Sequence, residues 1–154
     1  MNLLTRALVS GLTAGTLSMW TLAQRGRSEG QPAAKMLNAP SHWLFGDRAL
    51  VEHAPSWRYT GTGTLIHESS AVMWALLFER LVSRRDRAPS LASIAASAAV
   101  VTGVAAVVDL KLVPERLTPG FEHHLSGRSL LLVYASVAAG LALSGWLMRS
   151  SPRR

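Results

Sequence analysis

The longest uncharged stretch of the chain, residues 90–108, constrains the fold more than any other feature. These nineteen residues are rich in Ala and Val and include no Asp, Glu, Lys or Arg. A hydrocarbon core about 30 Å thick is crossed by roughly 20 helical residues. A run of this length and apolarity predicts a transmembrane helix.

Three further segments have a similar character, and the predicted helices cover residues 7–24, 61–82, 90–113 and 121–148. Only 16% of the chain is charged, whereas soluble domains carry about 25%. We therefore predict an all-α fold, an integral membrane four-helix bundle that forms one transmembrane domain over residues 1–154. Residues 25–60 are expected to form a long extracytoplasmic loop between the first two helices.

The first apolar segment has a second interpretation. Residues 1–23 combine an early Arg6, an apolar stretch and a small-residue end, as a cleaved signal peptide does. Against this, Gly11 and Gly15 form a pattern that suits close helix packing. Arg25 and Arg27 follow directly, as at the end of a retained helix.

Small residues also recur at a spacing of four in other predicted helices. Ala95, Ala99 and Gly103 form one such stripe, and Ala139 and Gly140 belong to another that begins at residue 135. Because lipid is as apolar as leucine, helices in membranes associate through such close-packing faces. We therefore expect these stripes to face neighbouring helices of the bundle.

Charge places the chain at a membrane rather than on nucleic acid. The net charge is +7, and many of the arginines border apolar segments, which is a membrane pattern. They are dense in the short loop at 84–87 and in the tail at 149–154. We predict a multi-pass protein of the bacterial inner membrane with both termini in the cytoplasm. Its expected partners are the lipid bilayer and other membrane protein subunits, with no nucleic acid.

Signatures of common enzymes are missing. The chain has no cysteine, which excludes disulfides, thiolate catalysis and cysteine metal sites. Gly61 and Gly63 form a glycine-containing turn without the lysine of a phosphate-binding loop. These features favour binding or assembly over turnover.

The long loop at 25–60 is expected to lie on the membrane surface. Residues 38–46 predict a short interfacial helix with Asn38 as the N-cap and Pro40 in its first turn. Aromatic side chains in the same loop favour the membrane–water interface. Together with the Pro-Gly turn near residue 119, this loop is the predicted functional surface, with the loop residues Asn38, His42, Asp47, Arg116, Pro119 and Gly120.

Ionisable residues at membrane depth are costly and require a partner or a function. In an antiparallel bundle, the start of the second helix, the end of the third and the start of the fourth share one side. Histidine and carboxylate side chains gather there, and they could bind zinc, iron, copper or manganese. The candidate metal ligands are His67, Glu68, Asp109, Glu122, His123 and His124.

The favoured interpretation of this cluster is an ion-pair and hydrogen-bond network, with the metal site as the alternative. In it the carboxylates pair with Lys111, Arg116 and Arg128, and the histidines are neutral donors. Haem between histidines is a less favoured option. Glu79 shares a helix face with Glu68. Two roles are predicted for Glu79: an ion pair with the nearby arginines Arg80 and Arg84, or part of a proton path with Glu68.

Two functions follow from the sequence. The favoured one is a structural, accessory or binding component of a membrane complex. The alternative is a metal-binding membrane enzyme or carrier that uses the histidine-rich face.

Overall fold

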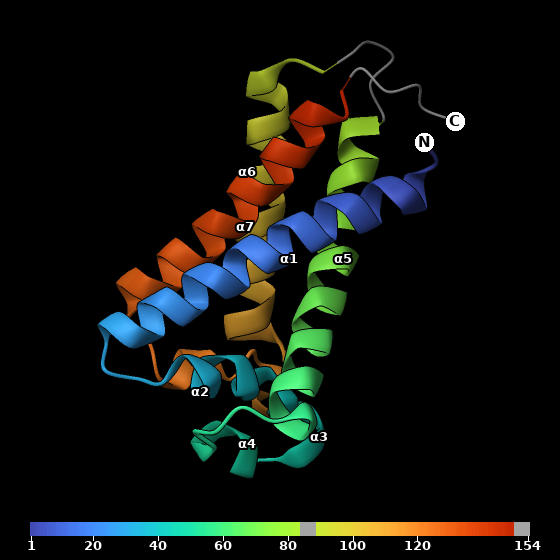
Figure 1. The fold of residues 1–154 in the computed structure, drawn as a ribbon. Helices are drawn as coiled ribbons and strands as arrows, with labels where there is room; N and C mark the ends of the chain where they lie inside the picture. Colours follow the sequence, from blue (N-terminus) through green and yellow to red (C-terminus); the bar gives the residue numbers. More distant parts are fainter. Residues whose placement is uncertain (84–88, 150–154) are drawn as a thin grey trace.

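The computed structural model describes residues 1–83 and 89–149, and this part of the chain is helical without any strand. The all-α prediction is thus confirmed. Four long helices dominate it: α1 (Leu3–Ser28), α5 (Thr62–Ser83), α6 (Leu91–Val107) and α7 (Gly127–Leu147). They run alternately in opposite directions, so the start of α1 and the end of α7 lie at the same end of the molecule (Figure 1).

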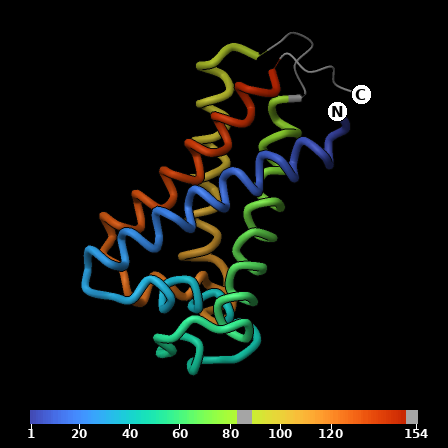
Figure 2. The backbone as a smooth tube through the Cα atoms, viewed as in Figure 1, coloured from blue at the N-terminus to red at the C-terminus, as the bar shows by residue number. Residues whose placement is uncertain are grey.

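Short helices gather at the opposite end (Figure 2). They are α2 (Ala33–Asn38), η1 (Ala39–Ser41), α3 (His42–Phe45), α4 (Arg48–Val51) and η2 (Trp57–Gly61) from the first connection. The connection between α6 and α7 adds η3 (Val108–Leu112), η4 (Glu115–Leu117) and η5 (Phe121–His123). We refer to residues 33–61 and 108–123 as the cap layer.

The long helices differ from the predicted segments mainly at their ends. α1 is longer than predicted because Asn2 caps its first turn and the helix continues through both arginines. α6 begins after Ser90, whose hydroxyl accepts from the Ser93 amide as expected of an N-cap. α7 begins at Gly127 rather than at 121, because Ser126 caps it and a separate 3₁₀ turn precedes it.

The first connection contains more helix than predicted. Its first helix starts at Ala33 after Pro32, and Asn38 ends that helix instead of capping the next one. The Asn38 side chain is fully buried. It donates to the carbonyl oxygens of Glu52 and Ala54 and accepts from the Thr60 hydroxyl. The Asn38 side-chain amide thus links three residues of the first connection, and sequence spacing alone does not predict these contacts.

α1 lies between α5 and α7 and packs closely against both. A Cβ on Gly140 would lie 2.5 Å from the Ala14 Cα, and a Cβ on Gly11 would lie 2.5 Å from the Val72 Cα. These glycines let the helix backbones touch, as predicted for small-residue faces. The core of the bundle around Ala14 consists of Ala75, Phe78, Val82, Ile94, Ala98, Val101 and Leu141.

The small-residue stripe of α6 behaves differently from the prediction. Ala95, Ala99 and Gly103 are exposed, and no atom of the described residues lies within 4 Å of a Cβ built on Gly103. The buried face of α6 carries Ile94 and Val101 instead. Since α6 is apolar all round, its composition does not indicate which face turns inward.

Two helices are long and apolar enough to cross a membrane: α6 with its continuation, Leu91–Leu112, and α7, Gly127–Leu147. This agrees with the predicted membrane character at the level of these two helices. The arginines at 84–87 and at 153–154, on which the predicted orientation partly rests, lie outside the described residues.

Candidate functional site: a pocket beneath the cap layer

A pocket of about 190 Å³ lies where the cap layer meets α5, α6 and α7. Its wall is mostly apolar, with aromatic rings from Trp43, Trp74, Phe121 and Tyr134. Ala71 and Ala105 contribute small side chains to the same wall, which leaves room between the helices. A cavity of about 150 Å³ already holds a benzene-sized molecule, so this pocket has space for one ring or a short chain.

The pocket opens beside residues that are themselves exposed. Met73 on α5 and Leu117 on η4 line it and are 56% and 43% exposed. Phe121 and Val133 also line the pocket and are buried. A ligand therefore has access from the outer surface between α5 and η4.

Asp109 supplies the carboxylate of the pocket wall. The Tyr134 hydroxyl donates to Asp109 Oδ2 across 3.3 Å. No described Lys, Arg or His forms an ion pair with Asp109, so its predicted partners Lys111, Arg116 and Arg128 do not pair with it. The physical reason is position: Tyr134 reaches it from α7, whereas Arg116 and Arg128 are exposed.

Glu122 on η5 adds a second negative charge near this wall and acts electrostatically on Asp109 and Tyr134. Both of its carboxylate oxygens are buried and accept no hydrogen bond from the described residues. Among residues 1–83 and 89–149, its one ion-pair contact is with His123 Nε2, at 3.6 Å. This side of the pocket is therefore electronegative.

His67 on α5 is a polar wall residue of another kind. Its Nε2 lies 2.8 Å from Ser18 Oγ, and Ser18 donates to the Gly15 carbonyl oxygen. Because the serine proton is used in that bond, we assign the His67 Nε2 as the donor to Ser18. With Nε2 as the donor, Nδ1 has no hydrogen-bond partner among the described residues.

Glu68, adjacent to His67, points elsewhere. Its Oε1 accepts from the Thr16 hydroxyl at 3.3 Å, and its carboxylate occupies the space where a Cβ of Gly15 would lie. Gly15 therefore makes room for a carboxylate between α1 and α5, a role that the small-residue pattern did not indicate. Adjacent residues on a helix point about 100° apart, which separates Glu68 from the pocket.

The predicted metal ligands do not assemble. Within residues 1–83 and 89–149 no three His, Asp or Glu side chains form a group that could hold a metal ion. His67 faces Ser18, Glu68 faces Thr16, and Asp109 faces Tyr134. His123 is exposed, and His124 follows directly after the cap layer. Burial lowers the pKa of the His124 imidazole, with Lys35 contributing.

The predicted functional loops do come together. The Trp43 indole donates to the Thr118 carbonyl oxygen at 2.7 Å, and His42 Nε2 lies 3.3 Å from the Glu115 carbonyl oxygen. Gly120 has a φ of 86°, and a Cβ there would lie 2.8 Å from the Ala39 carbonyl oxygen. Gly120 thus allows the second loop to approach the first.

The other predicted loop residues have separate positions. Pro119 lines the pocket. Asp47 and Arg116 are exposed. The sequence did not single out Trp74, Tyr134 or Ser18 as site residues, because isolated aromatic or serine residues within apolar helices give no specific signal.

A buried ion pair lies at the end of the bundle far from the cap layer. Arg6 Nε donates to Glu79 Oε2 at 2.9 Å, and Ser10 Oγ donates to Glu79 Oε1 at 2.6 Å. Arg6 also donates to the Met148 carbonyl oxygen at 3.1 Å. The predicted partners of Glu79 were the nearby arginines, but Arg80 is exposed, Arg84 lies outside the described residues, and Arg6 pairs with Glu79 from another helix.

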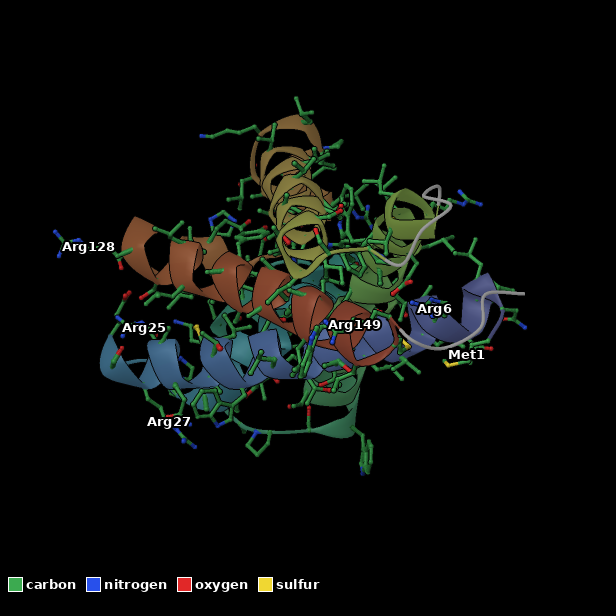
Figure 3. All side chains as sticks on the ribbon, turned by 90° about the horizontal axis from the view of Figure 1, so that it is seen from above. Met1, Arg6, Arg25, Arg27, Arg128 and Arg149 are labelled. Atoms are coloured by element: carbon green, nitrogen blue, oxygen red, sulfur yellow. The ribbon has the colours of Figure 1, made fainter. Side chains whose placement is uncertain are left out.

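A polar clamp joins α1 to α7 at the cap-layer end. Glu29 accepts hydrogen bonds from the Ser126 amide and from the hydroxyls of Ser126 and Ser129. Arg25 donates to Ser129 Oγ at 2.9 Å. The serine hydrogen bonds hold the pKa of Glu29 at about 2. Seen from above, α1 and α7 lie side by side with Arg25 and Arg128 at one end and Arg6 and Arg149 towards the other (Figure 3).

This architecture defines a helical bundle with a helical cap and an aromatic, electronegative pocket between them. Comparison with known proteins adds no relative: the chain matches no protein-family model, and no curated protein or solved structure gives a significant match.

Proposed function

We propose that this protein is a multi-pass membrane protein whose role is to bind a small amphiphilic molecule in the pocket beneath the cap layer. In this proposal all four long helices span a bacterial inner membrane, and both termini are cytoplasmic. The observation that carries the binding role is the pocket itself: an apolar, aromatic cavity with a few polar groups is the usual form of a small-molecule site.

The four-span arrangement is supported by an inside-out distribution of side chains in α1 and α5. The fully buried residues of these helices include Arg6, Ser10, Ser18 and Glu79. Their exposed residues include large apolar side chains: Leu4, Leu8, Val9, Leu12 and Trp20 on α1, and Leu65, Met73 and Leu77 on α5. Polar residues in membrane-spanning helices face the bundle interior, so inward polar groups reduce the overall hydropathy of these helices without exposing charge to lipid.

Retention of α1 is part of the same proposal. α1 buries Arg6 against Glu79 and Gly11 against Val72. Cleavage after residue 23 would remove both contacts and leave Glu79 without its cation.

A cavity-filling variant tests the binding role. Ala105 lines the pocket and is 3% exposed, and Ala99 lies on the outer face of the same helix. We expect Ala105→Leu to abolish binding of a one-ring probe, benzyl alcohol, by calorimetry in a neutral detergent. Ala99→Leu adds the same volume outside the pocket and should leave binding unchanged. Wild-type protein that binds no such probe would contradict the proposed role.

A second candidate, an accessory subunit of a larger membrane complex, is favoured by the outward stripe of Ala95, Ala99 and Gly103. A partner helix could approach such a face closely. Purification in mild detergent should then yield a second protein in stoichiometric amount. Wild-type protein that purifies alone would contradict this candidate function. Bulky substitution at Gly103 should release it.

A further inference from the structure

We propose that the ligand of the pocket beneath the cap layer is a small organic ammonium ion with a one-ring or similarly sized apolar group. This inference rests on the proposed binding function and specifies the chemistry of the ligand. It is carried by three features of the pocket wall: its charge, its aromatic rings and the free oxygen of its carboxylate.

The charge of the wall is uncompensated. Asp109 lines the pocket without a described cation partner, and Glu122 lies near enough to repel it. The pocket lining within the described chain includes no Lys or Arg. A carboxylate partly buried among apolar groups is costly unless it is paired or neutralised. A ligand cation supplies the missing charge in a way that a neutral or anionic ligand does not.

The aromatic rings suit the same ligand. Trp43, Trp74, Phe121 and Tyr134 line the pocket. Aromatic faces attract cations, and cages of such rings bind ammonium groups. The rings also provide the apolar contact for the remainder of the molecule.

Hydrogen bonding at the carboxylate favours a cation that donates. Tyr134 binds Asp109 Oδ2, and Oδ1 accepts no hydrogen bond from residues 1–83 or 89–149. A primary or secondary ammonium group presents N–H donors and a positive charge together, so it can bind Oδ1. The same lining also holds a buried donor without a partner among the described residues, the Trp74 indole N–H.

The size of the pocket limits the apolar part. About 190 Å³ is slightly more than the cavity of about 150 Å³ that holds benzene. Benzylammonium fits this space, and benzyl alcohol and benzoate are neutral and anionic probes of nearly the same shape.

Calorimetric titration of the full chain in a neutral detergent at neutral pH tests the inference with these three probes. We expect benzylammonium to bind at least about tenfold more tightly than benzyl alcohol, because a charged hydrogen bond contributes more than a neutral one, and benzoate to bind most weakly. Asp109→Asn keeps the shape of the side chain and should remove the preference for the cation while leaving benzyl alcohol binding in place.

The possible results separate the two proposals. Equal binding of benzylammonium and benzyl alcohol by the wild-type protein would overturn the cation inference and leave the binding function standing. Failure of both probes to bind would overturn both. If Asp109→Asn does not fold, the order of the three probes on wild-type protein decides the matter alone, and Glu122→Gln, which keeps Asp109, should reduce the preference by a smaller factor.

Discussion

At the scale of single residues, the strongest feature outside the pocket is the fully buried pair of Arg6 and Glu79. The two carboxylate oxygens of Glu79 are occupied by Arg6 and Ser10. Removing one member of a buried ion pair strands the other, and this costs more than replacing both by apolar residues.

Glu79→Leu alone should therefore destabilise the protein by about 3–5 kcal/mol. The double variant Arg6→Met with Glu79→Leu should recover much of that loss, because no charge remains unpaired. Thermal unfolding of the single and double variants in detergent measures this coupling. If the stability losses of Arg6→Met and Glu79→Leu, measured separately, simply add in the double variant, a direct ion pair between the two residues would be contradicted.

A second residue-scale prediction concerns pH. The pKa of Glu29 is lowered from 4.5 to about 2 by hydrogen bonds from Ser126 and Ser129. A carboxyl group whose pKa falls on folding stabilises the fold above its unfolded pKa and loses that contribution as pH decreases through its folded pKa. The melting temperature should therefore fall between about pH 5 and pH 2, and Glu29→Gln should weaken that dependence. An identical pH profile in the variant would exclude Glu29 as its source.

At the scale of elements, substitution of two glycines in apolar helices is expected to have opposite effects on stability. A Cβ on Gly140 would lie 2.5 Å from the Ala14 backbone, whereas a Cβ on Gly103 meets nothing within 4 Å. Gly140→Ala should push α1 and α7 apart and cost about 1–3 kcal/mol. Gly103→Ala should be neutral or stabilise the helix by about 0.5–1 kcal/mol. Melting temperatures of the two variants compare them, and equal effects would argue against the close approach of α1 and α7.

These glycines also illustrate how far the sequence predicts the fold. Helix positions could be predicted because the length and apolarity of a run are local properties. Orientation could not be predicted for α6, since Val100 on its outer face is as apolar as Val101 on its inner face. Pairings such as Arg6 with Glu79 join residues on different helices, and neither spacing nor periodicity carries that information.

The pocket was partly predictable for the same reasons. The topology argument correctly placed His67 and Asp109 at one end of the bundle, and the two predicted loops do meet there. The side chains that accompany them, Tyr134 and Ser18, depend on how α1 and α7 are rotated about their axes. A metal cluster was a reasonable hypothesis from residue types, but rotation turns His67, Glu68 and Asp109 towards three different partners.

At the scale of the whole molecule, the proposed topology is directly measurable because the chain has no cysteine. Asp47 and Arg149 are exposed and lie after the first and last long helices, and Asn2 precedes the first. With four spans, a cysteine at 47 should react with an impermeant thiol reagent in intact cells, whereas cysteines at 2 and 149 should react only after permeabilisation. Labelling of 47 and 149 from the same side would contradict a membrane-spanning α5, and labelling of 2 and 47 from the same side would contradict a membrane-spanning α1.

The contacts of Arg6 also bear on the order in which the molecule is made. Arg6 is synthesised early, yet its partners are Glu79 and the carbonyl group of Met148. Because a ribosome makes the chain from the N-terminus, Arg6 on α1 has no carboxylate partner until Glu79 on α5 has been made. The position of α1 is completed only when the end of α7 has emerged. For about the first half of synthesis Arg6 therefore has no carboxylate partner on α5, and the position of α1 is among the last to be fixed.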